Sequence, residues 1–195
     1  MRSSDGTVSF PGFTPGAEVG GWDTWIFGKP VGAISQAHLG NHLMGEMLTG
    51  DPNRQAGHFD FDHDARPAIE KFAPILNATD PDLSRFAAHG GKLILFHGWS
   101  DPAIPPTNTI RYYESIKAKM GGVRRAKFVR LFMVPGMQHC FGGPGPSSFG
   151  GIAVARQPAD PDTDLSAAVE RWVEKGVPSE ASKRRFTGGD TRAPV

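Results

Sequence analysis

The sequence predicts an α/β protein, in which helices cover a parallel β-sheet. Two short apolar runs, residues 92–97 and 128–134, have the composition of strands buried in a sheet. Residues 108–120 and 164–175, which follow the two runs in turn, carry apolar side chains at helical spacing. Strand, helix, strand, helix is the order of a parallel sheet with right-handed crossovers.

From Met1 to about Arg54 the sequence predicts mostly irregular structure. This part of the chain is punctuated by Gly and Pro and carries large aromatic side chains, among them Trp22 and Trp25. One short helix is expected over residues 34–48.

The middle of the chain predicts three short elements. Residues 59–62 alternate aromatic and acidic side chains, which is the period of a half-buried strand. Residues 66–72 are then expected to form a helix that Pro74 closes. Asp80 is expected to start a further short helix, which ends near Gly90, because an aspartate can cap free amide groups.

The last part of the chain carries the clearest patterns. Gly121 and Gly176 follow the two predicted helices and are expected to end them. Trp172 lies on the apolar face of the second helix. Two strands alone leave an unpaired edge on each side, so this unit is expected to need more sheet than the chain supplies.

Composition limits the classes of partner. A chain of 195 residues with 38% hydrophobic content predicts one globular domain or a large piece of one. A net charge of +1 without long charge runs predicts neither a nucleic-acid nor a membrane partner. Met1 to Gly20 lacks the pattern of a signal peptide, which favours a cytoplasmic product or a chain whose natural start is missing. The single cysteine, Cys140, has no partner for an internal disulfide.

Asp101 and His139 are the candidate acid and base of an active site. Each follows one of the two predicted strands, and loops at the carboxyl ends of parallel strands meet at one edge of a sheet. An aspartate beside a histidine fixes its tautomer and stabilises the imidazolium that forms when it takes a proton from a nucleophile. From placement alone, two ordinary hydrogen-bonded loop residues remain the alternative.

A serine for this pair to activate is not apparent. No Gly-x-Ser-x-Gly elbow, the turn that presents the nucleophile in α/β-hydrolases, occurs in the sequence. Ser100 shares the loop of Asp101, Ser147 and Ser148 lack a preceding strand, and Ser35 has a poor context.

Several segments share a distinctive combination of motifs. They are Asp-Pro-Asp-Leu at 80–83, Gly-Gly-Lys-Leu-Ile-Leu-Phe-His-Gly-Trp-Ser-Asp-Pro at 90–102, Tyr-Tyr at 112–113, Arg-Leu-Phe-Met-Val-Pro-Gly-Met-Gln-His-Cys at 130–140, and Trp-Val-Glu-Lys-Gly at 172–176. Together they closely resemble the C-terminal part of the tannase and feruloyl esterase family. Pro-Gly-Ala-Glu at 15–18 echoes the start of the same region.

The resemblance implies the C-terminal part of an α/β-hydrolase fold, preceded by the end of an irregular lid. Residues 1–80 would be the end of the lid and its return to the core, residues 81–180 the last strands and helices of the core, and residues 181–195 a tail. Asp101 matches the acid of the Ser-Asp-His triad and His139 the base. Cys140 matches a cysteine that in the family forms a disulfide beside the nucleophilic serine.

The resemblance also implies what lies outside the chain. The nucleophile segment, the oxyanion-hole loop and a calcium-binding loop of the lid are expected N-terminal to Met1, so no cofactor is expected in this chain. A full-length parent would be secreted or periplasmic, whereas the compartment of this chain stays open. Trp22, Trp25 and Ile104 are candidates for an aromatic ester pocket, although such residues more often only pack.

Other candidate sites have weaker support. Asp60, Asp62 and Asp64 imitate the opening of a calcium loop, but the residues at the turn and closing positions do not fit, so no metal site is predicted. Cys140 is a poor nucleophile for His139, because sequence neighbours usually point apart. His97 and His89 are expected to be structural.

We therefore predict a carboxylic ester hydrolase of aromatic esters whose nucleophile lies outside the chain, so that the chain alone has little activity. The alternative is a non-catalytic remnant or complementing subunit that needs a partner chain, which the missing N-terminal part of the same enzyme could provide. A small-ligand-binding domain is disfavoured, because no Gly-rich loop opens a helix.

Overall fold

The computed structural model describes residues 11–28, 35–60, 62–147, 149, 161–162 and 164–179. The chain divides into two compact units. One comprises Met1–Gly12 and Glu18–Thr79, and the other comprises Phe13–Ala17 and Asp80–Val195. The tail predicted at residues 181–195 lies outside the described residues.

Helices and turns make up the described part of the first unit. Its elements are α1 (Gly21–Trp25), α2 (Gln36–Asn41), the π-helix η1 (His42–Thr49), the 3-10 helix η2 (Ala56–His58) and α3 (Ala65–Leu76). The helix expected over residues 34–48 is thus present as α2 and η1, except that residue 34 is not described. It begins after Ser35 because the Ser35 hydroxyl accepts a hydrogen bond from the His38 amide at 3.2 Å.

The strand predicted over residues 59–62 is wrong. Residues 59 and 60 have no regular structure, residue 62 lies in a turn, and residue 61 is not described. The Asp60 carboxylate accepts hydrogen bonds from the amides of Asp62 (2.9 Å) and His63 (3.3 Å). Side-chain bonds of this kind compete with strand pairing for the backbone donors, so the alternating pattern folds as a turn.

Two predicted helix boundaries are also wrong. Helix α3 runs through Pro74 to Leu76. Proline removes one donor, but the Asn77 amide still reaches the Ala73 carbonyl at 3.0 Å and completes the last turn. The next helix, α4 (Ser84–Ala88), begins later than expected, because the Asp80 carboxylate binds the amide of Asp82, and the Asp82 carboxylate binds the first-turn amide of Ser84.

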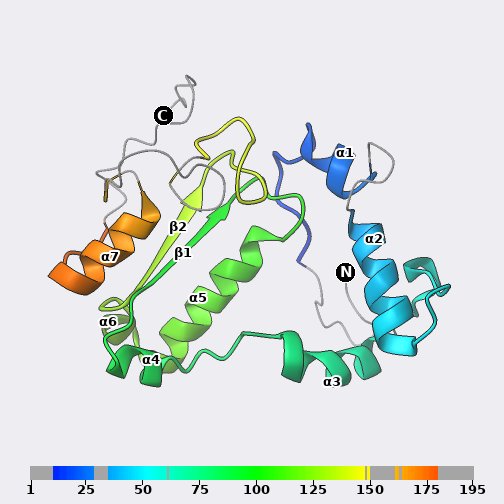
Figure 1. Cartoon of the computed structure of the whole chain (residues 1–195), viewed down its shortest axis with the longest axis horizontal. Helices are drawn as coiled ribbons and strands as arrows, with labels where there is room; N and C mark the ends of the chain where they lie inside the picture. Colours follow the sequence, from blue (N-terminus) through cyan, green and yellow to red (C-terminus); the bar gives the residue numbers. More distant parts are fainter. Residues whose placement is uncertain are drawn as a thin grey trace. The chain divides into compact units, whose positions relative to one another are not determined.

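The second unit contains a parallel pair of strands. Strand β1 (Leu93–Gly98) pairs with β2 (Val129–Val134), and the two are joined through α5 (Pro106–Met120) and α6 (Gly122–Arg125). Helix α7 (Leu165–Lys175) follows, and Figure 1 shows the strands between α5 and α7. The order predicted from the sequence is confirmed, with boundaries that move by one or two residues.

Apolar side chains hold α5 against the strands. Ile116 of α5 is fully buried with Phe128 and Val129, and Leu95 packs against this cluster. On α7, Trp172 is 3% exposed. At the carboxyl end of β2, Val134 packs with Met137 and Phe149 in a second buried cluster, which supports the loop after that strand.

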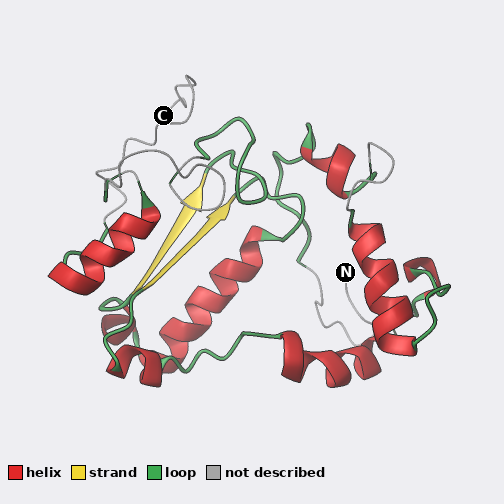
Figure 2. Ribbon diagram, in the orientation of Figure 1, coloured by secondary structure: helices red, strands yellow, loops and turns green. Residues whose placement is uncertain are grey.

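Both strands end at the same edge of the sheet. Figure 2 shows the two arrowheads side by side, each running into a loop. Within the described part of the chain β1 and β2 are the only strands. The helices described there are too short or too polar to span a lipid bilayer.

Candidate active site

Two backbone hydrogen bonds join the loops that follow the strands. The Trp99 amide donates to the Val134 carbonyl at 2.9 Å, and the Ser100 amide donates to the Met137 carbonyl at 3.1 Å. The loop after β1, which carries Asp101, is therefore held against the loop after β2, which carries His139.

Gly98 makes this close approach of the loops possible. A Cβ atom at this position would lie 2.7 Å from the Gln138 carbonyl oxygen and closer still to that of Met137. Only glycine fits between the backbones. Sequence reasoning missed this role, although a glycine directly after a buried strand is the signal that could have found it.

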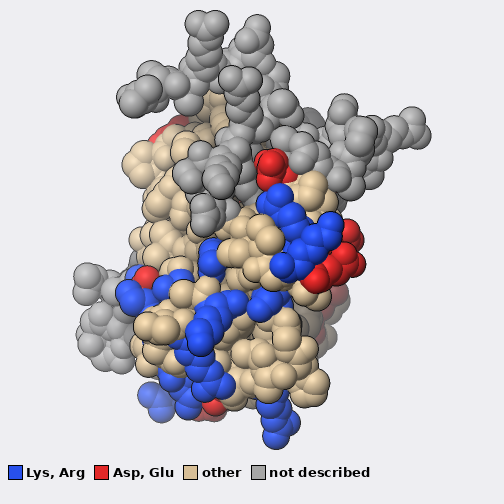
Figure 3. Space-filling model, turned by 90° about the vertical axis from the view of Figure 1, so that its left-hand side faces the viewer, with Lys and Arg blue, Asp and Glu red and all other residues tan. Residues whose placement is uncertain are grey.

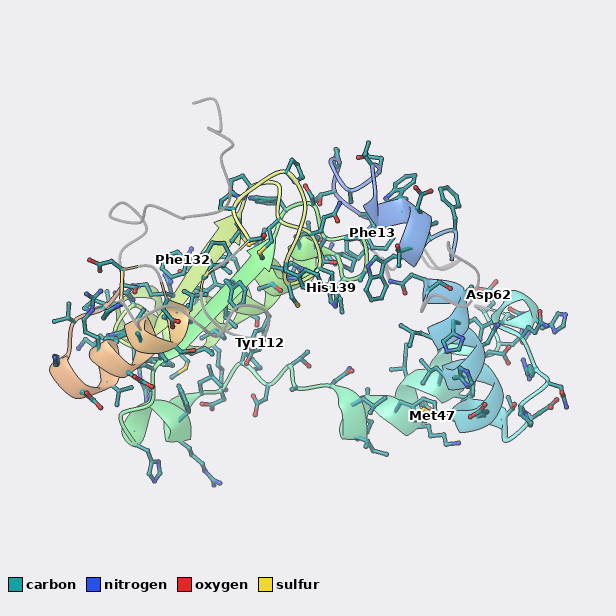
Figure 4. The ribbon with its side chains drawn as sticks, turned by 45° about the horizontal axis from the view of Figure 1, so that its top comes forward. Phe13, Met47, Asp62, Tyr112, Phe132 and His139 are labelled. Atoms are coloured by element: carbon teal, nitrogen blue, oxygen red, sulfur yellow. The ribbon has the colours of Figure 1, made fainter. Side chains whose placement is uncertain are left out.

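Asp101 and His139 meet at this edge, as their placement after two strands predicts. The His139 Nδ1 atom lies 3.0 Å from the Asp101 Oδ2 atom. The Asp101 side chain is 4% exposed and the His139 side chain 33% exposed. Figure 4 shows His139 in the loop beyond the ends of the strands. The candidate acid is thus buried, and the candidate base reaches the surface.

Four donors surround the Asp101 carboxyl group. The amides of Ala103 and Ile104 donate to Oδ1 at 2.8 Å and 2.9 Å, while His97 Nε2 and His139 Nδ1 lie 3.0 Å from Oδ2. Burial alone would raise the pKa of Asp101, but these hydrogen bonds, led by that of His97, outweigh it and lower the pKa to about 2. Asp101 is therefore a carboxylate at neutral pH.

The charge of Asp101 decides which nitrogen of His139 carries the proton. A carboxylate only accepts hydrogen bonds, so His139 must donate from Nδ1. A neutral His139 then has its lone pair on Nε2, the nitrogen with which a general base takes a proton from a nucleophile.

His97 lies closer to the candidate site than its expected structural role suggested. It projects from β1, and besides Asp101 it contacts the Thr109 hydroxyl through Nδ1 at 2.7 Å. The spacing of four residues between His97 and Asp101 is a signal that sequence reasoning did not use. The His89 ring, by contrast, contacts its own helix: its Nδ1 atom lies 2.8 Å from the Arg85 carbonyl oxygen.

Cys140 is a free, exposed cysteine directly after His139. Its φ angle of 63° lies in the left-handed region, which is uncommon for a residue other than glycine. Partial burial, and then the negative charge of Asp101, raise the pKa of the thiol. A raised pKa disfavours the thiolate, so these surroundings are those of a poor nucleophile.

The serines considered as candidate nucleophiles do not form a nucleophile elbow where they are described. Ser100 is 5% exposed and lies in a turn, where its hydroxyl fills the space beside Gly16. Ser35 caps α2. Ser147 lies in a loop, and Ser148 is outside the described residues. Each of the described three thus lacks the strand-to-helix turn that presents a nucleophile.

The candidate pocket residues fall in different units. Ile104 lies in the Asp101 loop of the second unit and is 48% exposed, so it is available to a ligand. Trp22 and Trp25 belong to α1 in the first unit, where the Trp22 and Phe27 rings meet edge to face. A substrate pocket that contains these residues stays a prediction.

The carboxylates of Asp60 and Asp64 bond to nearby amides and basic side chains. The Asp64 carboxylate receives Arg54 at 2.6 Å and the Asp60 amide at 2.9 Å, and Asp60 pairs with the His63 ring. No group of three metal-binding side chains occurs among the residues that the structure describes.

An open cavity of about 870 Å³ lies at the other edge of the sheet, next to residues that precede the strands. Lys92, Arg124 and Lys127 line it together with Phe128. Figure 3 shows a band of Lys and Arg side chains on the face that carries α4, α6 and α7. This cavity is separate from the Asp101 and His139 loops, which follow the strands.

Comparisons with known proteins converge on esterases. A sequence model described as tannase and feruloyl esterase matches residues 9–192. An uncharacterized esterase of Xanthomonas campestris is 40% identical over 87% of this chain and 34% of its own length. A probable feruloyl esterase B-2 of Aspergillus flavus is 32% identical over 92% of this chain and 34% of its own length.

A solved structure supports the same relationship. The crystal structure of an esterase from Aspergillus oryzae matches with a TM-score of 0.75 and 28% identity, over 91% of this chain and 34% of that chain. The predicted α/β-hydrolase fold is thereby confirmed. The chain spans about a third of the length of the relatives that it matches.

Proposed function

The chain belongs to the tannase and feruloyl esterase family, and we propose that it supplies the acid and the base of a carboxylic ester hydrolase. Asp101 is the acid and His139 the base. The observation that carries the proposal is the 3.0 Å contact between His139 Nδ1 and the buried Asp101 carboxylate, at the edge of the sheet where both strands end.

His139 would act first as a base and then as an acid. Its Nε2 atom takes the proton of a serine hydroxyl as the oxygen attacks the ester carbonyl carbon, and a tetrahedral intermediate forms. The imidazolium then protonates the leaving alcohol, which leaves an acyl-enzyme. A water molecule then attacks the acyl-enzyme in the same way, with His139 again as base and then as acid, and the carboxylic acid product is released. Asp101 stabilises the imidazolium in both halves of the reaction.

The serine of this mechanism lies outside the 195 residues. Two observations support this part of the proposal. The sequence contains no Gly-x-Ser-x-Gly segment, and the chain spans only about a third of its relatives. Ser100 is adjacent to Asp101 but lies buried in a turn, so it is a poor substitute.

Aromatic carboxylic esters are the proposed substrates. The support is the name of the Aspergillus flavus relative, a probable feruloyl esterase. In this chain Ile104 would contact the substrate, because its apolar side chain is exposed in the same loop as Asp101. Trp22 and Trp25 are further candidates for contact with an aromatic substrate.

Cys140 is proposed to form a disulfide with a cysteine near the nucleophile, which would tie the base loop to the nucleophile loop. The exposed thiol directly after His139 is compatible with such a bond. A disulfide there requires an oxidising compartment, in keeping with a secreted or periplasmic parent.

A chimera tests the proposal. In it, this chain replaces the segment of the Xanthomonas campestris esterase that it matches, and hydrolysis of methyl ferulate and a p-nitrophenyl ester is measured for the chimera and for the isolated chain. We expect turnover by the chimera alone. Turnover by the isolated chain that His139→Ala abolishes would contradict an external nucleophile, and a folded but inactive chimera would contradict the role of this chain in hydrolysis.

A further inference from the structure

His97 makes a set of contacts that packing in a strand does not require. Its side chain is 12% exposed, so its two ring nitrogens must find hydrogen-bond partners within the protein. The Nε2 atom lies 3.0 Å from Asp101 Oδ2 and 3.1 Å from the Ile104 carbonyl oxygen. The Nδ1 atom lies 2.7 Å from the Thr109 hydroxyl.

These partners determine where the His97 proton lies. A carboxylate oxygen and a carbonyl oxygen both only accept, so Nε2 must carry a hydrogen. The Thr109 hydroxyl can donate or accept, and it donates when His97 is neutral. Thr109 lies in the first turn of α5. The neutral Nε2–H tautomer satisfies every one of these contacts.

The Asp101 carboxylate needs a third point of attachment. The amides of Ala103 and Ile104 fix Oδ1, but the torsion that turns a carboxylate plane is broad. Oδ2 could therefore turn away from His139. The N–H of His97 holds Oδ2 from the strand side, while His139 approaches the same oxygen from the other loop.

We infer that His97 and Thr109 are positioning residues for the acid: the Thr109 hydroxyl holds His97 as the neutral Nε2–H tautomer, and that N–H directs Asp101 Oδ2 toward His139. The inference deepens the proposed function and rests on it, since it takes Asp101 as the acid. Neither residue touches the reacting atoms.

A neutral partner suits this position better than a cation. A protonated His97 would form an ion pair with Asp101 and compete with the His139 imidazolium for the same carboxylate charge. A neutral N–H orients the oxygen and leaves the charge available. This is why the hydroxyl of Thr109, which can complete a neutral imidazole, is part of the inference.

Nuclear magnetic resonance of the 195-residue chain tests the inference without any need for activity. Nitrogen-15 spectra of the histidine rings report the tautomers, and carbon-13 spectra of the aspartate carboxyls report the pKa of Asp101. Two matched pairs of variants separate the N–H and the hydroxyl from their packing: His97→Gln keeps an N–H donor that His97→Phe lacks, and Thr109→Ser keeps a hydroxyl that Thr109→Val lacks.

We expect His97 as Nε2–H in the parent chain and in Thr109→Ser, and a mixture of tautomers in Thr109→Val. In His97→Phe the pKa of Asp101 rises from about 2 toward its ordinary value of 3.8, whereas His97→Gln keeps it low. If His97→Phe does not fold, the Thr109 pair alone decides the outcome.

Three outcomes overturn the inference. The first is a parent chain in which His97 carries its proton on Nδ1. The second is an equal pKa of Asp101 in His97→Phe and His97→Gln, and the third is an unmixed Nε2–H tautomer of His97 in Thr109→Val. The same spectra keep the proposed function separate. If His139 carries no proton on Nδ1 in the parent chain, that result counts against the Asp101 and His139 pair itself, whatever the state of His97.

Discussion

Replacing Asp101 with asparagine should remove a defined part of the acid dependence of stability. The pKa of Asp101 in the folded chain is about 2, against an ordinary value of 3.8. Each unit of difference corresponds to about 1.4 kcal/mol, so the buried carboxylate contributes about 2 kcal/mol to the free energy of unfolding when it is charged. Four hydrogen bonds to a side chain that is 4% exposed are the source of this stability.

The direction in which pH changes this contribution to the free energy of unfolding follows from the direction of the pKa change. A folded-state pKa below the unfolded value means that the unfolded chain binds the proton more readily. The contribution of Asp101 is therefore fully present above pH 3.8 and is lost as the pH falls through about 2. Asparagine has no charge to lose over this range.

Urea unfolding of the parent chain and of Asp101→Asn, measured between pH 2 and pH 6, gives the test. We expect the parent to be the more stable chain above pH 4 by about 2 kcal/mol or more, and the difference to shrink by about that amount toward pH 2. Other carboxylates titrate in both chains and cancel in the difference. A difference that stays constant with pH would refute the hydrogen-bonded, charged Asp101 described above.

Two further predictions concern the loops around this carboxylate. Gly98→Ala should lower the free energy of unfolding by about 2–3 kcal/mol, because its methyl group would meet the Met137 and Gln138 carbonyls. Gly122→Ala, where a Cβ meets nothing, should change the free energy of unfolding by less than about 0.5 kcal/mol in the same denaturant titration. Equal effects of the two substitutions would contradict the close approach of the loops at Gly98. Alkylation of Cys140 by iodoacetamide at pH 8 should be faster in Asp101→Asn, because the Asp101 charge contributes to the raised pKa of the thiol; an unchanged rate would contradict that electrostatic contact.

Sequence patterns predicted the second unit well because its signals are local and redundant. The apolar runs of β1 and β2 and the glycines after α5 and α7 each mark an element without help from the rest of the chain. Parallel pairing then follows from the element order. Because the carboxyl ends of paired parallel strands share an edge, the meeting of Asp101 and His139 could be predicted as well.

Other features depend on contacts that a pattern does not contain. Phe59 to Asp62 has the period of a strand, yet hydrogen bonds from the backbone to Asp60 decide the outcome. The contact of His97 with Asp101 arises only when β1 and the start of α5 are folded together, since Thr109 and the Ile104 carbonyl complete it. Gly98 shows its role only once the two loops are adjacent.

The most direct test of the central claim, that Asp101 and His139 act as acid and base, is the ester hydrolysis rate of the chimera with the Xanthomonas campestris esterase and of its variants. From the general effect of removing members of a catalytic triad, we expect kcat to fall about 10⁶-fold in His139→Ala and about 10⁴-fold in Asp101→Asn. His89→Ala, which removes a histidine that bonds the Arg85 carbonyl, should leave kcat nearly unchanged. An active chimera whose kcat falls by less than tenfold in His139→Ala would contradict the account.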